Sequence, residues 1–171
     1  KQRIQCACAL SGEPYIDHAA IREFMGSLEY PLYYLDFETF STAVPLFDGT
    51  RPYQNIPFQF SLHVQPSTGA ASEHFEYLAP AGLDPRPALM AALDEYIGPE
   101  GSIMAYNKSF EDHVIKELGE AFPEFAPRAQ EINSRLVDLI VPFRNFAYYH
   151  PAQFGSASLK KVLPAVTGLG Y

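Results

Sequence analysis

Long apolar runs are missing from this sequence, and basic residues are few. Charges and prolines interrupt every apolar stretch well before the roughly 18 residues that a membrane helix needs, so we expect no membrane-spanning segment. Lys and Arg total 12 against 20 Asp and Glu, which gives a formal net charge of −8. A nucleic-acid coat protein would need many basic contacts to phosphates, so the charge argues against that class. A nuclease whose carboxylates gather divalent cations is still compatible with it.

Cysteine is also scarce, and the chain opens without an initiator Met or a signal peptide. Cys6 and Cys8 are too few for a tetrahedral zinc site and too close for a relaxed disulfide, so we expect free thiols. The 171 residues suffice for one domain. We interpret residues 1–13 as a linker or the tail of a preceding domain, and residues 14–171 as one domain truncated at its C-terminus. The expected location is cytoplasmic.

Hydrophobic periodicity predicts an α/β domain. A nearly all-apolar, Pro-bounded run at 32–38 is typical of a buried central strand, and two further strand-like runs at 59–64 and 74–78 favour an antiparallel meander. Asp17 is placed to cap a short amphipathic helix before them. The pattern then alternates, with helices expected at 85–97, 110–118, 140–146 and 158–166, and short strands at 102–105 and 136–137. This order predicts a mixed sheet flanked by helices.

Two carboxylates end the expected central strand. Asp36 and Glu38 stand at i and i+2, so they point to the same face of the strand. Two neighbouring carboxylates repel each other unless a cation or a shared proton relieves them. Mg²⁺ is often held by one or two carboxylates together with water and phosphate, so the pair suits a metal site. Taken alone, the tripeptide fits a strand that simply ends in solvated acids better than it fits a metal site.

A second acidic motif follows the short strand at 102–105. We expect Asn107 to cap the next helix, Phe110 to enter the core, and Glu111 to lie in the first helical turn, where the helix dipole favours a carboxylate. Glu111 would then face the end of the strand that carries Asp36. The alternative is an ordinary capping acid.

Together these motifs resemble the DEDD (DnaQ-like, ribonuclease-H-like) 3′–5′ exonuclease superfamily. Its first motif, D-x-E, is matched by Asp36 to Thr39, and its second, N-x-x-F-D, by Asn107 to Phe110 with Glu111 in the place of the acid. The wider context resembles an uncharacterised bacterial family within that superfamily, over about residues 30–171. Members of it can carry an upstream nuclease-like domain, which would be a partner of this one.

The resemblance implies a ribonuclease-H-like mixed sheet of about five strands, the first three antiparallel. It further implies that Asp36, Glu38 and Glu111 hold Mg²⁺ or Mn²⁺. The implied reaction is phosphodiester hydrolysis from a single-stranded end of DNA or RNA. Asn107 and Phe110 would belong to the substrate-binding surface, together with Thr39.

Two departures from the superfamily pattern favour an alternative. Glu111 replaces the usual Asp, and its extra methylene displaces the carboxylate by about 1 Å, which matters for tightly held geometry. The third motif, a Tyr or His followed five residues later by Asp, is missing, because no acid follows Leu163. The alternative is a catalytically degenerate nuclease fold that binds nucleic acid or protein.

Several other residues are candidates for supporting roles. In the loop after the first strand, Arg51 is expected to contact a phosphate, and Tyr53 to stack on a base. Asp138 is expected to cap a helix, with a substitute metal ligand as the alternative. His150 is a candidate general base.

The first motif also has a superficial likeness to that of a different enzyme class. Asp36 to Thr39 superficially matches the D-x-D-x-T motif of phosphatases with an aspartyl nucleophile. That chemistry needs Asp as the second acid, where this chain has Glu38.

Overall fold

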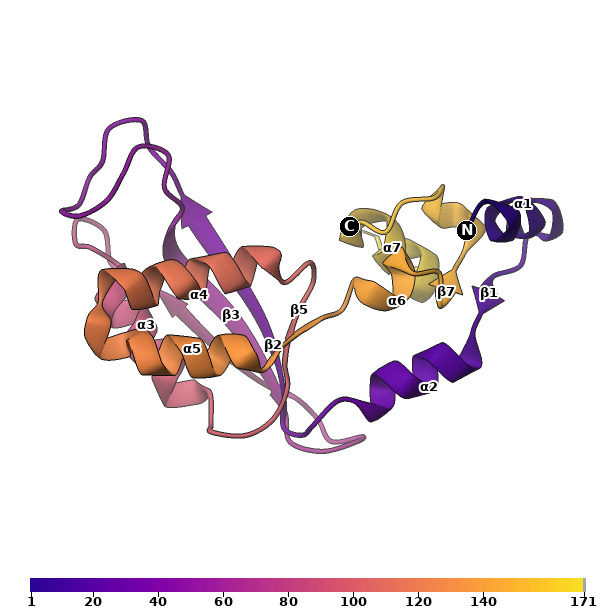
Figure 1. Ribbon diagram of the computed structural model, residues 1–171, viewed down its shortest axis with the longest axis horizontal. Helices are drawn as coiled ribbons and strands as arrows, with labels where there is room; N and C mark the ends of the chain where they lie inside the picture. The colour runs from indigo at the N-terminus through magenta and orange to yellow at the C-terminus, as the bar shows by residue number, and fades with distance from the viewer. Residues whose placement is uncertain (171) are drawn as a thin grey trace. The chain divides into compact units, whose positions relative to one another are not determined.

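The chain divides into two compact units. The computed structural model describes residues 1–170 (Figure 1); Tyr171, the last residue of the expected domain, lies outside the described residues. Glu29–Val137 form one unit, called here the sheet unit. Lys1–Leu28 and the segment from Asp138 onward form the other, called the terminal unit. The single domain expected over residues 14–171 is therefore distributed over both units.

The sheet unit contains the mixed five-stranded sheet, in the order β4-β3-β2-β5-β6. β2 pairs antiparallel with β3 and parallel with β5, and β3 pairs antiparallel with β4. This confirms the predicted α/β class, with β2 central and the first three strands of the sheet antiparallel. The strands are β2 (Leu32–Phe40), β3 (Ile56–Gln65), β4 (Glu73–Leu78), β5 (Ile103–Ala105) and β6 (Leu136–Asp138).

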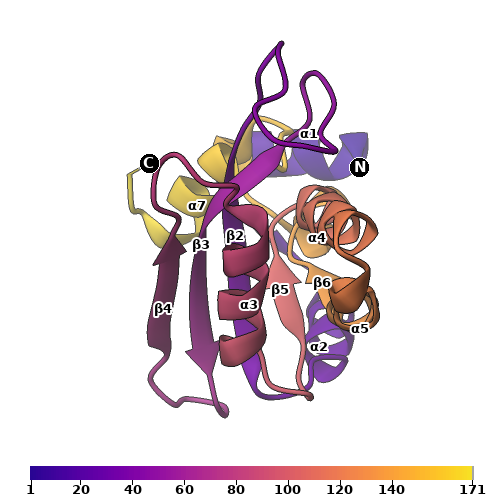
Figure 2. The ribbon, with the colours of Figure 1, turned by 90° about the vertical axis from the view of Figure 1, so that its left-hand side faces the viewer.

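Helices cover one face of this sheet (Figure 2). They are α3 (Arg86–Tyr96), α4 (Ser109–Ala121) and α5 (Ala126–Ser134), with a 3₁₀ turn at Pro123–Phe125. Alternation along β2 sends Tyr33, Leu35 and Phe37 into the core beneath these helices, each 4% exposed. The intervening Asp36 and Glu38 emerge on the opposite face, where both are exposed.

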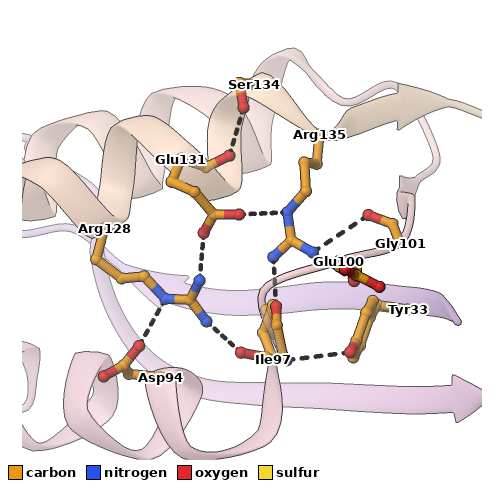
Figure 3. A network of polar contacts seen from close by, with 10 residues as sticks. Tyr33, Asp94, Ile97, Glu100, Gly101, Arg128, Glu131, Ser134 and Arg135 are labelled. Atoms are coloured by element: carbon orange, nitrogen blue, oxygen red, sulfur yellow. Dashed lines mark hydrogen bonds and ion pairs between the residues drawn. The ribbon is translucent and has the colours of Figure 1, made fainter.

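An arginine network fixes the connection between α3 and β5 (Figure 3). Arg135 donates hydrogen bonds to the carbonyl oxygens of Glu100 (2.6 Å) and Gly98 (2.8 Å). Arg128 binds Asp94 at 2.6 Å and also contacts Glu131 and the carbonyl of Ile97. Because backbone carbonyls in a turn need partners, these guanidinium groups hold the turn that delivers β5 to the side of β2.

A buried arginine begins α3. Arg86 is 4% exposed and binds Asp84 through two donors, Nε at 2.9 Å and Nη2 at 2.6 Å. Its guanidinium carbon also lies 5.1 Å from the centre of the Phe122 ring. Partial burial alone would raise the pKa of Asp84, but the hydrogen bonds and charge of Arg86 outweigh it and lower that pKa below its ordinary value.

Asp84→Asn is therefore expected to lower the free energy of unfolding at pH 7 by about 2 kcal/mol, the usual scale of a hydrogen bond to a charged group. A depressed carboxyl pKa stabilises the folded state above the unfolded pKa, near pH 4, and the stabilisation is lost as the pH falls through the folded pKa. The difference between the two proteins should thus shrink below about pH 4. Urea unfolding at several pH values measures it, and a pH-independent difference would contradict the assignment.

The terminal unit is built from short elements. β1 (Tyr15–Ile16) pairs antiparallel with β7 (Tyr148–Tyr149), and Phe146 stacks on Tyr149 with ring centroids 4.6 Å apart beside the buried Cys8. The helices are α1 (Gln2–Ser11), α2 (His18–Gly26), α6 (Val141–Arg144) and α7 (Leu159–Thr167), with a 3₁₀ turn at Pro151–Gln153. None of the helices found within residues 1–170 has the length and apolar character needed to cross a membrane.

Two helices differ from the sequence-based expectation. The expected linker at 1–13 contains α1, in which only Cys8 is buried, so no apolar stripe marked it. The helix α5 was not expected, since its sequence is polar and includes Pro127, although Ala129 and Ile132 are buried. The cap of α2 was predicted correctly, because Asp17 Oδ1 accepts hydrogen bonds from the N–H groups of residues 19 (3.1 Å) and 20 (3.0 Å).

Candidate carboxylate site

Asp36 and Glu38 lie together on the outer face of the central strand, as the sequence predicts. Asp36 is exposed as a residue, but partial desolvation of its carboxyl raises the pKa of that carboxyl above the ordinary value, and the charge of Glu38 raises it further. A hydrogen bond from the backbone of Phe37 opposes this shift but does not cancel it. The pair therefore carries an electrostatic repulsion that a bound cation would relieve.

A β-bulge follows the pair. Glu38 pairs with Gln59, whereas Thr39 pairs with Pro57, so Phe58 is an extra residue on β3. Bulges disrupt the ladder locally, bend the strand and re-aim side chains, and they are frequent beside active sites. Thr39, expected to touch the substrate, is half-buried at this bulge, directly after the acidic pair.

Glu111 lies on α4, the helix that follows the neighbouring parallel strand β5. The register of β2 and β5 places Tyr34 beside Met104, and the chain leaves β5 at Ala105, level with the acidic end of β2. α4 then begins at Ser109, and Glu111 in its first turn is only 4% exposed. A carboxylate in this position is favoured by the helix dipole. Phe110 is partly buried against the core, as expected.

The capping role expected of Asn107 is wrong. Lys108 stands at the N-cap position of α4, and its ammonium donates to the carbonyl of Leu136 at 2.8 Å. Asn107 instead has a left-handed backbone with φ 66°, which Asn tolerates better than most residues. Its side chain is exposed, and its expected contact with substrate stays a prediction.

The donor set at the acidic end of β2 fits a hard divalent cation. Asp36 and Glu38 offer carboxylate oxygens, and one or two carboxylates with water and phosphate are a common Mg²⁺ environment. Within residues 1–170, no three His, Cys, Asp or Glu side chains are gathered closely enough to hold a metal ion by themselves. Glu111 is thus not grouped with the pair, and its role as a third ligand stays a prediction.

The loop between β2 and β3 extends past the acidic end of β2 (Figure 2) and is anchored to α4. Arg51 Nη2 binds Glu117 Oε1 at 2.5 Å, and Gln54 Nε2 donates to Glu117 Oε2 at 3.3 Å. His113 Nε2 lies 3.3 Å from the same Glu117 carboxylate. Arg51, expected to contact phosphate, is therefore paired with a carboxylate here, while its side chain remains 58% exposed.

We expect Arg51→Ala to release this loop without unfolding the protein. An exposed ion pair contributes at most about 1 kcal/mol, so the free energy of unfolding should change little. Amide exchange at Tyr53 and Gln54 should accelerate, because the anchor to α4 is lost. Hydrogen–deuterium exchange measures this. Lys116→Ala is the control, since it removes an exposed pair with Glu120 (3.8 Å) on the same helix, and equal exchange in the two variants would contradict the anchoring role.

An apolar groove of about 580 Å³ opens in the sheet unit. Phe40, two residues after Glu38, lies 6.4 Å from Phe47 and 6.1 Å from Phe58, measured between ring centroids. These three rings line the groove with Leu46 and residues 79–83 and 85. Tyr53, expected to stack on a base, is 72% exposed on the loop above. Apolar and aromatic surface therefore lies close along the chain to the acidic pair.

The remaining candidates belong to the terminal unit. Asp138 Oδ1 accepts a hydrogen bond from the N–H of Ile140 at 3.1 Å, but Ile140 itself is at the N-cap of α6, so the capping role of Asp138 stays a prediction. His150 Nδ1 accepts from the N–H of Ala152 at 3.1 Å and caps the 3₁₀ turn. That bond occupies the Nδ1 lone pair, which leaves Nε2 for any proton transfer. The general-base role of His150 and the ligand role of Asp138 stay untested predictions.

Comparisons with known proteins identify a family. The model of a domain of unknown function, DUF2779, matches residues 33–158, which include both acidic motifs. The uncharacterized protein MG366 homolog of Mycoplasma pneumoniae is 31% identical over 144 residues, which cover 78% of this chain and 22% of that protein. The uncharacterized protein UU173 of Ureaplasma parvum is 28% identical over 160 residues, covering 87% of this chain and 23% of that protein.

The chain thus spans less than a quarter of the length of these curated relatives. No solved structure matches it significantly. The family match extends over most of the sheet unit and into the terminal unit, well beyond half of the 171 residues. On this evidence the chain belongs to the DUF2779 family.

Proposed function

We propose that this chain is the nuclease domain of a metal-dependent 3′–5′ exonuclease of the DEDD type. Asp36 and Glu38 would hold Mg²⁺ or Mn²⁺, with Glu111 as the third carboxylate. The substrate would be a single-stranded end of DNA or RNA. The bound ion would supply the positive charge that stabilises the phosphate in the transition state.

The observation that carries this proposal is the electrostatic state of the acidic pair. Two carboxylates on one face of a central strand, with the pKa of Asp36 raised by desolvation and by Glu38, make the folded protein bear a repulsion. Carboxylates placed side by side in this way supply the oxygen ligands that a divalent cation takes, and a bound cation relieves their repulsion. The left-handed Asn107 and the bulge after Glu38 lie in the same two motifs, where functional sites often hold uncommon backbone geometry.

The surroundings of the pair support a nucleic-acid substrate. Aromatic rings stack on bases irrespective of sequence, and the exposed Tyr53 and the groove beside Phe40 and Phe47 supply such surface. Arg51 would exchange its Glu117 partner for a substrate phosphate, which changes one charge-assisted bond for another.

The test is cleavage of 5′-labelled single-stranded DNA and RNA by this chain, with Mn²⁺ or Mg²⁺. A ladder that shortens from the 3′ end only in the presence of metal supports the proposal. Cleavage that persists in excess chelator would contradict it.

A second candidate is a degenerate nuclease fold that binds nucleic acid or protein without cutting. Two observations favour it, namely Glu111 in the place of the usual Asp and the lack of any three-ligand metal group in the described part of the chain. Retention of single-stranded oligonucleotides by this chain without cleavage would support it.

The proposal also includes the cellular location of the protein and a partner domain. We place the protein in the cytoplasm, where a reducing environment would keep the free thiols of Cys6 and Cys8 intact. Because the curated relatives are more than four times longer than the matched segment, an upstream nuclease-like domain is proposed as an intramolecular partner.

A further inference from the structure

Two histidines face each other on the outer surface of the sheet, away from the helices. His63 on β3 pairs directly with His74 on β4, and both side chains are exposed. Their rings stack with centroids 4.3 Å apart and planes inclined by 18°. We propose that this His pair, His63 with His74, is a binding site for a first-row transition-metal ion such as Zn²⁺, Ni²⁺ or Cu²⁺.

The spacing of the rings suits chelation. Zn–N bonds of about 2.0–2.1 Å at a tetrahedral angle place the two ligand nitrogens about 3.3 Å apart. The in-plane lone pairs of these stacked rings run nearly parallel, so the two imidazoles must rotate about their side-chain bonds before both point at one ion. Both side chains are exposed, and this rotation needs no change of backbone register. An antiparallel pair fixes the two Cα atoms directly opposite each other, so the second imidazole is held ready once the first has bound.

Ser61 orients one of the rings. Its Oγ lies 3.0 Å from His74 Nε2, and the residue is two positions before His63, on the same face of β3. Histidine ligands of metals usually donate their other ring N–H to an oxygen, which fixes the tautomer and the ring orientation. If His74 donates from Nε2 to Ser61, its Nδ1 lone pair is the one presented to a metal.

The charge around the pair favours a cation. Register places Asp36 opposite Ser61 on one side and Glu76 opposite Ser61 on the other, so the next row of side chains on this face bears two carboxylates. Within residues 1–170 no third His, Cys, Asp or Glu completes a metal group with the pair. Water would fill the other coordination positions, so we expect an exchangeable site.

The His pair is chemically separate from the carboxylates of β2. Imidazole suits Zn²⁺, Ni²⁺ and Cu²⁺, whereas carboxylate oxygens suit Mg²⁺ and Mn²⁺. One face of the sheet thus carries two donor sets of different preference, Asp36 with Glu38 and His63 with His74.

Zn²⁺ titration by calorimetry tests the site on the whole 171-residue chain and five variants. His63→Gln and His74→Gln should each lose a binding event that is retained by His18→Gln, which removes an exposed histidine of α2, and by Asp36→Asn. Ser61→Ala should bind Zn²⁺ roughly 10-fold more weakly, the lower end of the effect of removing an outer partner of a ligand. Zn²⁺ should raise the melting temperature of the unchanged chain and leave that of the two His-pair variants unmoved.

Unchanged Zn²⁺ binding in both His63→Gln and His74→Gln would overturn the proposal, and so would an unchanged chain that binds no Zn²⁺. Both histidines are exposed, so the metal-free variants should melt at the same temperature as the unchanged chain. Cu²⁺ provides a second readout, since its electron paramagnetic resonance spectrum should show coupling to two nitrogens in the unchanged chain. A spectrum with oxygen ligands alone would contradict the assignment to the His pair.

Discussion

Asp36→Asn is expected to reduce metal-dependent cleavage by roughly 10³-fold, in whichever form of the protein shows the activity. Metal-ion charge stabilisation is worth several kcal/mol in the transition state, and each 1.36 kcal/mol is a factor of ten in rate. The amide keeps the size of the carboxyl and one acceptor oxygen, but it lacks the negative charge that binds a hard cation. Initial rates on an end-labelled single strand at saturating Mn²⁺ measure the effect.

Stability distinguishes loss of the metal from loss of the fold. Because the folded-state pKa of Asp36 is raised, its contribution to stability is complete below the unfolded pKa and is lost as the pH rises through the folded pKa. The metal-free Asp36→Asn chain should therefore be at least as stable as the unchanged chain at pH 7. Glu73→Gln, an exposed acid on β4, is the control and should keep full activity. Wild-type rates in Asp36→Asn would disprove the role of this residue.

Gly101→Ala is expected to lower the free energy of unfolding by about 3–5 kcal/mol, the largest effect on stability of any substitution considered. Gly101 has φ +95°, and a Cβ there would lie 2.1 Å from the carbonyl oxygen of Pro31, a backbone atom that cannot swing away. Strained backbone costs about 1–3 kcal/mol and overpacking about 1–3 kcal/mol, so together they cost about 2–6 kcal/mol, and the expected loss lies in the middle of that range. The turn that would be distorted is the one held by Arg135, whose Nη1 donates to the carbonyl of Gly101 at 3.2 Å.

Gly69→Ala separates the cost of backbone strain from the cost of the steric clash. Gly69 also has a positive φ of +75°, but a Cβ there meets no atom within 4 Å. It should therefore cost only the backbone penalty, about 1–2 kcal/mol. Chemical denaturation of both variants measures the difference, and equal losses would show that the approach of Gly101 to Pro31 does not determine its stability effect.

The sheet was predictable because its signals are local. An apolar, Pro-bounded run identified β2, and alternation along it determined that Asp36 and Glu38 share a face. The strand pattern after it identified β3 and β4. The helix α5 was missed because its polar sequence begins with Ala126 and Pro127, and its place is determined by contacts that local periodicity does not report. One such contact is between α5 and α4. Gly119 of α4 lets the two helices pack closely, since a Cβ there would lie 2.8 Å from the Cβ of Ala129 on α5.

The site was predictable to a lesser degree. The sequence motif located Glu111 correctly in the first turn of α4, but the start of that helix was misplaced because Asn107 adopts a left-handed backbone that no residue pattern announces. The pairing of Arg51 with Glu117 joins residues 66 positions apart, and a single sequence carries no signal for it. The division of the chain into two units was missed for the same reason, because residues 1–28 associate with a segment more than 100 positions away.

The central claim is that Asp36 and Glu38 form a divalent-cation site, and Mn²⁺ calorimetry on the 171-residue chain and its Asp36→Asn variant tests it most directly. Binding in the unchanged chain that disappears in Asp36→Asn, while the variant keeps its melting temperature, is the predicted result. Equal binding in both proteins, or no binding in either, would contradict the account.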